Sequence, residues 1–380
     1  MIFMGKELKR TWAEIDLGAV ENNYKVIRNM IGPDRKYLAV VKANAYGHGA
    51  VRLSAELERL GADYFGVATF NEAKELREGG ITKPILVLGH TPTEMTDEII
   101  KYDVTQSVSS VKAAKEFNEL AKECGKKLKV HIKVDSGMSR VGFLTRGEAF
   151  ESGVKAIEEV CKLEWLDHEG IFTHFAVSDV KNEECEAYTR KQFATFMKTI
   201  DALKEKGIEF DIRHCANSGA ILNYPEMYLD MVRPGIVYYG AGDGAAEAGL
   251  KPIMTLKTCI YLEKNYAETT DVGYGRTWTG EPELRLGVLP IGYADGFLRV
   301  FSNKATLISK CGPVPVRGRV CMDMMMVDLT EVPEVGEGDE LEIFGKNQTV
   351  DYMSAMAGTI PHELLCAVGR RVPRIYIQPK

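Results

Sequence analysis

The stretch AVVKANAYGHGA, residues 39–50, decides the fold of this 380-residue chain. The apolar run that leads into Lys42 predicts a buried strand with this lysine at its end. A lysine in that position is poorly hydrated, which lowers its pKa until the amine can act as a nucleophile or a base. Tyr46 then offers a phenol, and Gly47 and Gly49 allow the backbone to approach a ligand. Taken alone, the pattern is also typical of an ordinary strand end whose lysine reaches solvent.

Outward from this stretch, short β-branched runs alternate with longer amphipathic stretches through about the first 240 residues, which is the size of a (β/α)8 barrel. Such alternation predicts a parallel sheet. A doubly wound open sheet is the alternative, but no G-x-G-x-x-G motif follows the first strand. The barrel is therefore the favoured fold. Its expected strands are 37–42, 64–68, 84–88, 104–108, 129–134, 168–173, 211–215 and 229–233.

The pattern of predicted strands and helices changes after the Gly/Ala-rich segment at 240–249. Short strands with turn signals follow, and one helix interrupts them near 350–357. We therefore expect a barrel over residues 12–244 and a mainly antiparallel β domain over 245–380. Residues 1–11 are a candidate further strand of this second domain.

Composition narrows the possible functions. The chain is 45% hydrophobic and 27% charged, with a net charge of −6, which argues against nucleic acid as a partner. It has no run of 18 apolar residues and no apolar leader, so we expect a cytoplasmic protein that contacts no membrane. The eight cysteines are scattered without a C-x-x-C pair, and no metal site is expected.

Basic side chains gather where the predicted strands end. The carboxyl ends of barrel strands carry the working residues, and those side chains meet on one face. Two lysines, two arginines and a histidine on one face would repel one another unless an anion lay among them. These residues are Lys42, Lys133, Arg140, His174 and Arg233.

The anion we expect is a phosphate. Barrels of this kind often bind phosphate through the loops after the last two strands and through a helix N-terminus. In this chain Asn217 and Ser218 precede or open a helix after the seventh strand, and Gly235 and Ile236 follow the eighth. A phosphorylated carbonyl cofactor opposite a strand-end lysine indicates pyridoxal 5'-phosphate (PLP) bound as a Schiff base.

With these motifs in place, the chain resembles the alanine racemases. The resemblance covers nearly the whole sequence, with the motifs in family order. They are TWAEIDLGAVENN, AVVKANAYGHGA, KVDSGMSRVG, GIFTHFA, HCANSGA, MVRPGI, VGYGRTW, IGYADG, GRVCMDM and RRVPRIY.

The resemblance implies a role for each matching residue. Lys42 would hold PLP and act as one catalytic base, and Tyr274 would be the second base, supplied by the partner subunit of a homodimer. The phosphate would be held by Tyr46, Ser218, Gly235 and Ile236, and Asn217 would be a further cofactor-binding residue. Arg233 would face the pyridine nitrogen and His174 the ring, while Arg140 would touch both the cofactor and the substrate carboxylate. The remaining positions are Lys133, which is often carbamylated in the family, the gate residue Tyr293, and Met322 and Asp323, which would line the substrate site.

The implied activity is interconversion of L-alanine and D-alanine by two bases, which would supply D-alanine for peptidoglycan. Removing the Cα proton on one face and returning it on the other suits two bases on opposite sides. Ser136 and Ser139 are mild departures from the family pattern. Arg370 stands where many members have a pocket tyrosine, which leaves serine, or small amino acids in general, as the alternative substrate.

Two alternative functions are considered, one with the same two-domain architecture and one with the barrel alone. A PLP-dependent decarboxylase of basic amino acids would need a carboxylate at the ring nitrogen, where this chain has Arg233. A non-catalytic PLP-binding protein would need neither the second domain nor Tyr274. Loss of optical rotation from L-alanine separates the three.

Overall fold

The computed structural model describes residues 10–378, which divide into two compact units. The barrel unit comprises Tyr24–Ala45 and Ala50–Tyr238. The sheet unit comprises the chain up to Asn23, the short segment Tyr46–Gly49, and the chain from Tyr239 onward. Within the described residues, no helix combines the length and apolar character that a membrane crossing requires.

The barrel unit contains a parallel sheet in the order β10-β2-β3-β4-β5-β6-β8-β9. Two backbone hydrogen bonds bridge the remaining gap between β9 and β10, from Asp230 N to Arg213 O and from Arg233 N to Ala216 O (3.1 and 2.9 Å). The predicted eight-stranded barrel is therefore confirmed. Its strands are β2 (Lys36–Val40), β3 (Tyr64–Val67), β4 (Ile85–Val87), β5 (Thr105–Val108), β6 (Leu128–Asp135), β8 (Leu166–Phe172), β9 (Ile212–His214) and β10 (Met231–Val232). The short strand β7 (Phe143–Leu144) pairs with β6.

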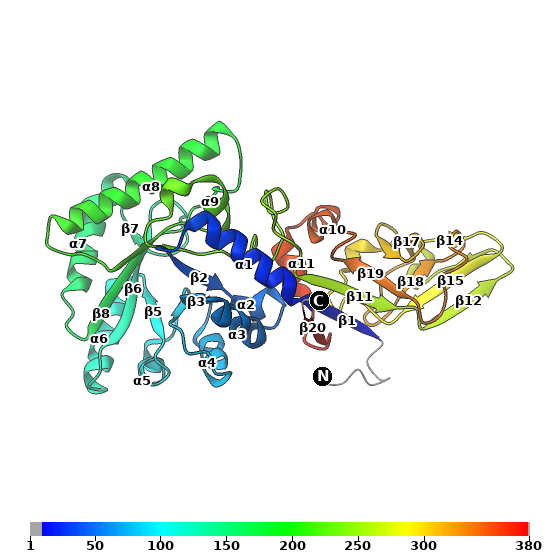
Figure 1. Ribbon diagram of the computed structural model, residues 1–380, viewed down its shortest axis with the longest axis horizontal. Coiled ribbons are helices and arrows are strands. Elements are labelled where there is room, and N and C mark those ends of the chain that lie inside the picture. Colours follow the sequence, from blue (N-terminus) through cyan, green and yellow to red (C-terminus); the bar gives the residue numbers. More distant parts are fainter. Residues whose placement is uncertain (1–9, 379–380) are drawn as a thin grey trace. The chain divides into compact units, whose positions relative to one another are not determined.

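Helices cover the outside of this sheet (Figure 1). Side-chain caps fix where several of them begin: Thr69 and Glu72 form a capping box for α4, and Ser110 and Asn182 cap α6 and α8. The helices are α1 (Leu17–Ile31), α2 (Lys42–Tyr46), α3 (Ala50–Leu60), α4 (Phe70–Glu78), α5 (Thr96–Lys101), α6 (Val111–Glu123), α7 (Phe150–Cys161), α8 (Glu183–Lys204) and α9 (Ser218–Asn223).

The sheet unit is built on a nine-stranded sheet in which all neighbours are antiparallel except β1 with β20. In order these strands are β12 (Leu262–Tyr266), β15 (Leu284–Leu289), β18 (Met325–Asp328), β17 (Gly312–Arg317), β16 (Thr306–Ser309), β19 (Glu340–Phe344), β11 (Met254–Cys259), β1 (Thr11–Asp16) and β20 (Arg374–Ile377). Strands β13 (Thr270–Asp271) and β14 (Thr279–Gly280) form a separate hairpin. This confirms the mainly antiparallel second domain.

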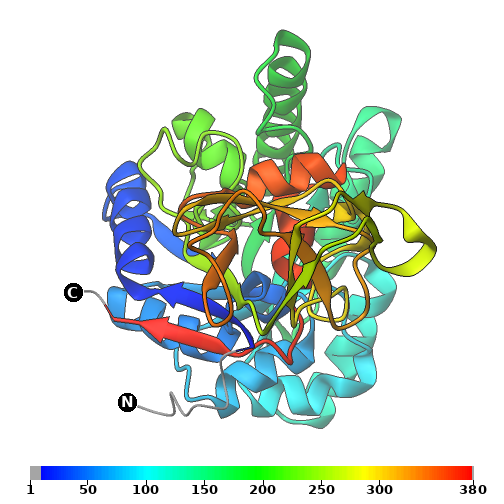
Figure 2. The same ribbon diagram turned by 90° about the vertical axis from the view of Figure 1, so that its right-hand side faces the viewer.

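Strands from the two ends of the chain lie side by side in this sheet. Figure 2 shows β1 in blue next to β20 in red, with Ala13 opposite Arg374. The prediction assigned residue 12 onward to the barrel, but β1 belongs to the second sheet because its other neighbour is β11. Residues 1–9 of the candidate extra strand lie outside the described residues, and the boundary at 244/245 remains a prediction. Two helices rather than one interrupt the strands, α10 (Val350–Ala357) and α11 (Pro361–Ala367).

Candidate active site

The lysine of the opening stretch begins a turn of unusual backbone conformation. Ala43, Asn44 and Ala45 in α2 have φ of 52°, 54° and 53°, and Tyr46 has 49°. A left-handed conformation costs an L-residue roughly 1–2 kcal/mol, so a run of four needs support from its surroundings. The sequence predicted a small polar segment after Lys42 but not its handedness.

Side chains from neighbouring helices supply that support. A carboxylate oxygen of Glu72 accepts from Ala43 N, and the other accepts from Ala68 N (both 2.7 Å). Asn44 Oδ1 accepts from Ala50 N at 2.8 Å, which ties the turn to the first residue of α3. The turn is therefore held firmly, and it fixes the position of Lys42 just beyond the end of β2.

Basic side chains lie at this end of the barrel, and Lys133 and Arg233 among them are buried. Lys133 is 4% exposed, and its Nζ lies 4.6 Å from the centre of the Phe172 ring. Burial and the charges of Arg233 and Arg140 lower the pKa of Lys133 well below its ordinary value. Burial lowers the pKa of His174 in the same way, and the charges of Arg233, Lys133, Arg140 and Lys42 lower it further. The structure thus brings together all five predicted residues of the cationic face.

Arg233 is held by neutral acceptors. Its Nη2 donates to the carbonyls of Thr173 and Cys215 (2.8 and 3.0 Å) and to His174 Nδ1 (3.2 Å), and its Nη1 donates to His214 Nδ1 (2.9 Å). Burial lowers the pKa of this guanidinium to about 10. Within residues 10–378, no carboxylate forms a salt bridge with Arg233, Arg140 or Lys133. An anionic ligand would therefore meet uncompensated positive charge here.

The predicted phosphate-binding loops meet at Ser218. Gly235 N donates to Ser218 Oγ at 3.0 Å, so the hydroxyl proton of Ser218 is left to donate to another group. Asn217 instead caps α9, since its Oδ1 accepts from Ala220 N and from Ser178 Oγ (3.1 and 2.7 Å). Ile236 is buried beside this loop.

Tyr274 lies in the sheet unit, on the 3-10 turn Tyr274–Arg276, and is 71% exposed. Gly273 and Gly275 on either side have φ of 72° and 74°. A Cβ at Gly275 would lie 2.8 Å from Arg319 Nη1, the movable end of a side chain, so the positive φ rather than a lack of space calls for glycine here. The turn presents the phenol to the surface of its own unit.

The remaining sheet-unit predictions form a second group. Tyr293 N donates to Cys321 O and Ala294 N to Met322 O (both 3.1 Å), which joins the Tyr293 loop to the segment before Asp323. Tyr293 and Met322 are exposed. The Asp323 carboxylate accepts from Arg371 at 2.6 Å, so its charge is already paired.

Two predicted pocket residues have contrasting surroundings in the sheet unit. Tyr46 is buried, and its ring stacks on Tyr239 with 4.8 Å between ring centres. Burial raises the pKa of this phenol. Arg370 is exposed, whereas its neighbour Arg371 is tied to Asp295 and Asp323.

Sequence reasoning missed the side chains behind Arg233. His214 and His131 are fully buried and hydrogen-bonded to each other, and His131 continues to Glu169. One signal was present: in KVHIKV, His131 lies two residues before Lys133, so both point to the same face of the strand. Of the other polar groups, no cluster of three or more His, Cys, Asp or Glu side chains within the described chain could hold a metal ion.

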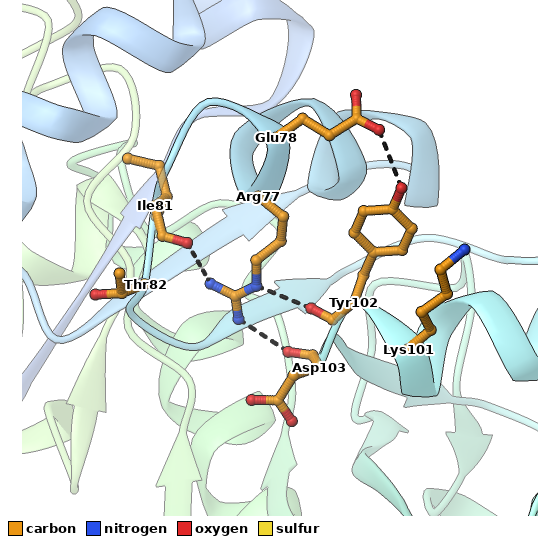
Figure 3. Close-up of a pocket in the computed structure, with 7 residues that line it drawn as sticks. All are labelled: Arg77, Glu78, Ile81, Thr82, Lys101, Tyr102 and Asp103. Atoms are coloured by element: carbon orange, nitrogen blue, oxygen red, sulfur yellow. Dashed lines mark hydrogen bonds between the residues drawn. The ribbon is translucent and has the colours of Figure 1, made fainter.

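A surface pocket of about 490 Å³ lies at the other end of the barrel (Figure 3). Arg77 donates there to the carbonyls of Ile81, Tyr102 and Asp103 (2.8, 2.9 and 2.9 Å). These residues precede the strands, opposite the end where barrel active sites lie. Because the Arg77 guanidinium holds neighbouring loops together, we assign this pocket a structural rather than a catalytic role.

Comparison with known proteins bears on both units. A family model for the N-terminal domain of alanine racemase matches residues 15–243, and one for the C-terminal domain matches residues 253–376. The chain is 43% identical to alanine racemase 2 of Caldanaerobacter subterraneus subsp. tengcongensis, over 98% of this chain and 96% of that one.

Solved structures agree with this match. The alanine racemase of Clostridium difficile 630 superposes with a TM-score of 0.90 at 40% identity, over 97% of this chain and 96% of that one. The alanine racemase of Bartonella henselae, with covalently bound pyridoxal phosphate, superposes with a TM-score of 0.86 at 29% identity, over 97% of this chain and 99% of that one.

Proposed function

Because the chain belongs to the alanine racemase family, we propose that it interconverts L-alanine and D-alanine. The observation that carries this proposal is the basic end of the barrel, where the buried guanidinium of Arg233 donates to His174 Nδ1 and forms no salt bridge with a carboxylate among residues 10–378. We further propose that the D-alanine supplies peptidoglycan. The purified protein with added PLP should abolish the optical rotation of L-alanine. Retained rotation in protein that has bound PLP would contradict the proposal.

The donor set at this end of the barrel fits PLP. Lys42 supplies an amine, Ser218 a hydroxyl proton for a phosphate, and Arg233 a guanidinium whose charge no contacting carboxylate neutralises. When bound, PLP would withdraw electrons from the Cα of the amino acid and so make its proton removable. Borohydride should fix the cofactor to the peptide that contains Lys42, and label on another lysine would contradict this assignment.

We assign the two bases to Lys42 and Tyr274. The charge of Lys42 acts on His174 together with those of Arg233, Arg140 and Lys133, so the amine lies among the residues that would hold the cofactor. Arg140 would hold the substrate carboxylate by charge-assisted hydrogen bonds. Tyr293, Met322 and Asp323 would limit the size of the side chain that enters.

The exposed position of Tyr274 supports a homodimer with shared sites. A phenol that moves a proton to a carbon acid works best out of contact with water, yet Tyr274 is 71% exposed in its own unit. A second copy of the chain would cover it. Mixing inactive Lys42→Ala protein with inactive Tyr274→Phe protein should restore activity, because one hybrid site then contains both bases. No recovery despite demonstrated subunit exchange would contradict shared sites.

Lys133 is the candidate for carbamylation. Its lowered pKa keeps the buried amine neutral, and a neutral amine adds to CO2 to form a carbamate with loss of one proton. The new anion would lie between Arg140 and Arg233, whose charges both act on Lys133. Protein equilibrated with 13C-labelled bicarbonate should show one carbamate carbon signal that is absent in Lys133→Met.

A further inference from the structure

A continuous row of hydrogen-bonded side chains runs through the barrel unit behind Arg233. Arg233 Nη1 lies 2.9 Å from His214 Nδ1, and His214 Nε2 lies 2.9 Å from His131 Nδ1. His131 Nε2 lies 3.0 Å from Glu169 Oε2, which also accepts from the Tyr64 hydroxyl at 2.6 Å. We call Arg233, His214, His131 and Glu169 the relay.

Chemistry at the Arg233 end determines where each proton of the relay lies. A guanidinium only donates, so His214 Nδ1 must accept and His214 must carry its proton on Nε2. That proton is donated to His131 Nδ1, so His131 also carries its proton on Nε2. The last donation reaches Glu169, and an ionised carboxylate only accepts. Both ends therefore require the same order of protons, with two neutral imidazoles between a cation and an anion.

Features of the neighbouring strands β6 and β8 provide the space that the relay occupies. A Cβ at Gly170 would lie 2.6–2.8 Å from three ring atoms of His131, so only glycine fits beside that ring. The pairing of β6 with β8 shifts register between Lys129 and His131, where β8 carries one extra residue. Such a bulge re-aims side chains, and here Glu169 reaches the His131 ring. On the other side, the Phe172 ring stacks on His214 at 4.8 Å.

The two ends of the relay lie at opposite ends of the barrel. Arg233 directly follows β10, at the carboxyl end of the strands. Glu169 contacts Tyr64, the first residue of β3, and Tyr64 in turn contacts Thr105, the first residue of β5. The relay is the hydrogen-bonded path from the buried charge of Arg233 to a carboxylate. Burial raises the pKa of Glu169, but hydrogen bonds from His131 and Tyr64 contribute to a net lowering of this pKa. Glu169 therefore stays ionised.

We propose that Glu169 is a positioning residue for the active site: through His131 and His214 it sets the direction of the relay and keeps Arg233 placed as a donor. This rests on the proposed function in one respect, that Arg233 faces the cofactor. An uncharged amide in place of Glu169 could present either an acceptor or a donor to His131, so the proton order would lose one of its two determinants.

The first test needs no cofactor, and substitutions serve only to assign its signals. Nitrogen NMR of 15N-histidine-labelled apoprotein should show two neutral histidines in the Nε2–H form. They are identified by their loss in His131→Gln and His214→Gln. A proton on Nδ1 of either ring, or an imidazolium, would overturn the proposal.

The second test compares Glu169→Gln with Glu158→Gln. Glu158 is a matched control, because its side chain is 21% exposed against 23% for Glu169 and also accepts a hydrogen bond, from Lys162, but on the outer helix α7. In Glu169→Gln we expect the 15N signals of His131 and His214 to shift, because an amide oxygen accepts more weakly than a carboxylate and Arg233 alone then fixes the proton order. PLP binding and kcat should each fall about tenfold, the lower end of the effect known for hydrogen-bond partners behind a metal ligand. Glu158→Gln should match the wild type.

The outcomes distinguish this inference from the proposed function. A wild-type protein that fails to racemise alanine contradicts the function, while the histidine tautomers of the apoprotein still test the relay. An active wild type whose Glu169→Gln variant matches Glu158→Gln in the His131 and His214 signals and in PLP affinity overturns the relay alone. If Glu169→Gln fails to fold, the wild-type tautomers remain the deciding measurement.

Discussion

The two ends of the barrel differ in whether their basic side chains form salt bridges with carboxylates. Where the strands begin, Arg28 pairs with Asp63, Arg213 with Asp230 and Lys129 with Asp103, at 2.8, 2.7 and 3.6 Å. Where the strands end, Lys133, Arg140 and Arg233 form no salt bridge with any carboxylate among residues 10–378. The nearby Asp135 accepts instead from the backbone of Gly137 and Ser139 (both 3.0 Å).

This difference separates positive charges that stabilise the fold from positive charges that remain available to bind a ligand. Paired cations at the strand starts join loops, whereas the buried and unpaired guanidinium of Arg233 raises the free energy of the folded protein until an anion arrives. Such an arrangement is expected where the anion belongs to a cofactor or substrate. The following substitutions test this difference between the two ends.

The largest effect is expected from Lys42→Ala. Removing a base and the cofactor-bearing amine together should lower kcat by about a thousandfold or more. Lys101→Ala is the control, because Lys101 lies at the other end of the barrel and pairs with Glu98 at 2.8 Å. Polarimetry on both purified variants checks the prediction. Equal activities would remove the distinction between the two ends.

Arg77→Met should affect stability rather than catalysis. Arg77 donates to four main-chain carbonyls, including Lys83 O at 2.7 Å, and their loss should lower the free energy of unfolding by about 2 kcal/mol. Arg59→Met is the control, because Arg59 makes an exposed ion pair with Glu56. Urea unfolding and kcat are measured on both variants. A fall in kcat at unchanged stability would assign Arg77 to the active site.

Lys133→Met should change the pH dependence of stability. The unfolded chain keeps this lysine protonated up to about pH 10.4, whereas the folded protein, with a lowered pKa, does not. The unfolded state therefore binds the extra proton, and wild-type stability should rise with pH relative to the variant, by at most about 1.4 kcal/mol per pH unit.

Urea unfolding of apoprotein in CO2-free buffer at pH 7.5, 8.5 and 9.5 measures this slope. Lys129→Met, on the same strand but exposed at the other end, is the control. A stability difference between wild type and Lys133→Met that stays constant with pH would show that the buried amine remains protonated.

The smallest effect is expected from Arg370→Tyr. An apolar pocket discriminates against the serine hydroxyl by roughly a hundredfold, and a nearby donor reduces that preference. Arg370 is free of the ion pairs that hold Arg371, so it can supply such a donor. The ratio of kcat/KM for L-alanine over L-serine should rise about threefold in Arg370→Tyr. An unchanged ratio would mean that Arg370 does not face the substrate.

Much of the architecture follows from local pattern. All eight barrel strands lie where short β-branched runs predicted them, because a buried parallel strand must be apolar along its length. The five basic residues of the cationic face could be grouped because strands of one barrel end at one face. Strand β1 was harder to assign, since TWAEID alone does not show that its partners are β11 and β20.

What the sequence by itself determined is therefore the order of elements and the residues delivered to each strand end. The tertiary structure decided what those residues contact. The left-handed turn after Lys42 depends on Glu72, 30 residues further along, and the relay depends on a bulge in β8 that re-aims Glu169. Periodicity records which face a side chain occupies. It does not record register shifts or hydrogen bonds between distant strands, because these arise only when the sheet closes.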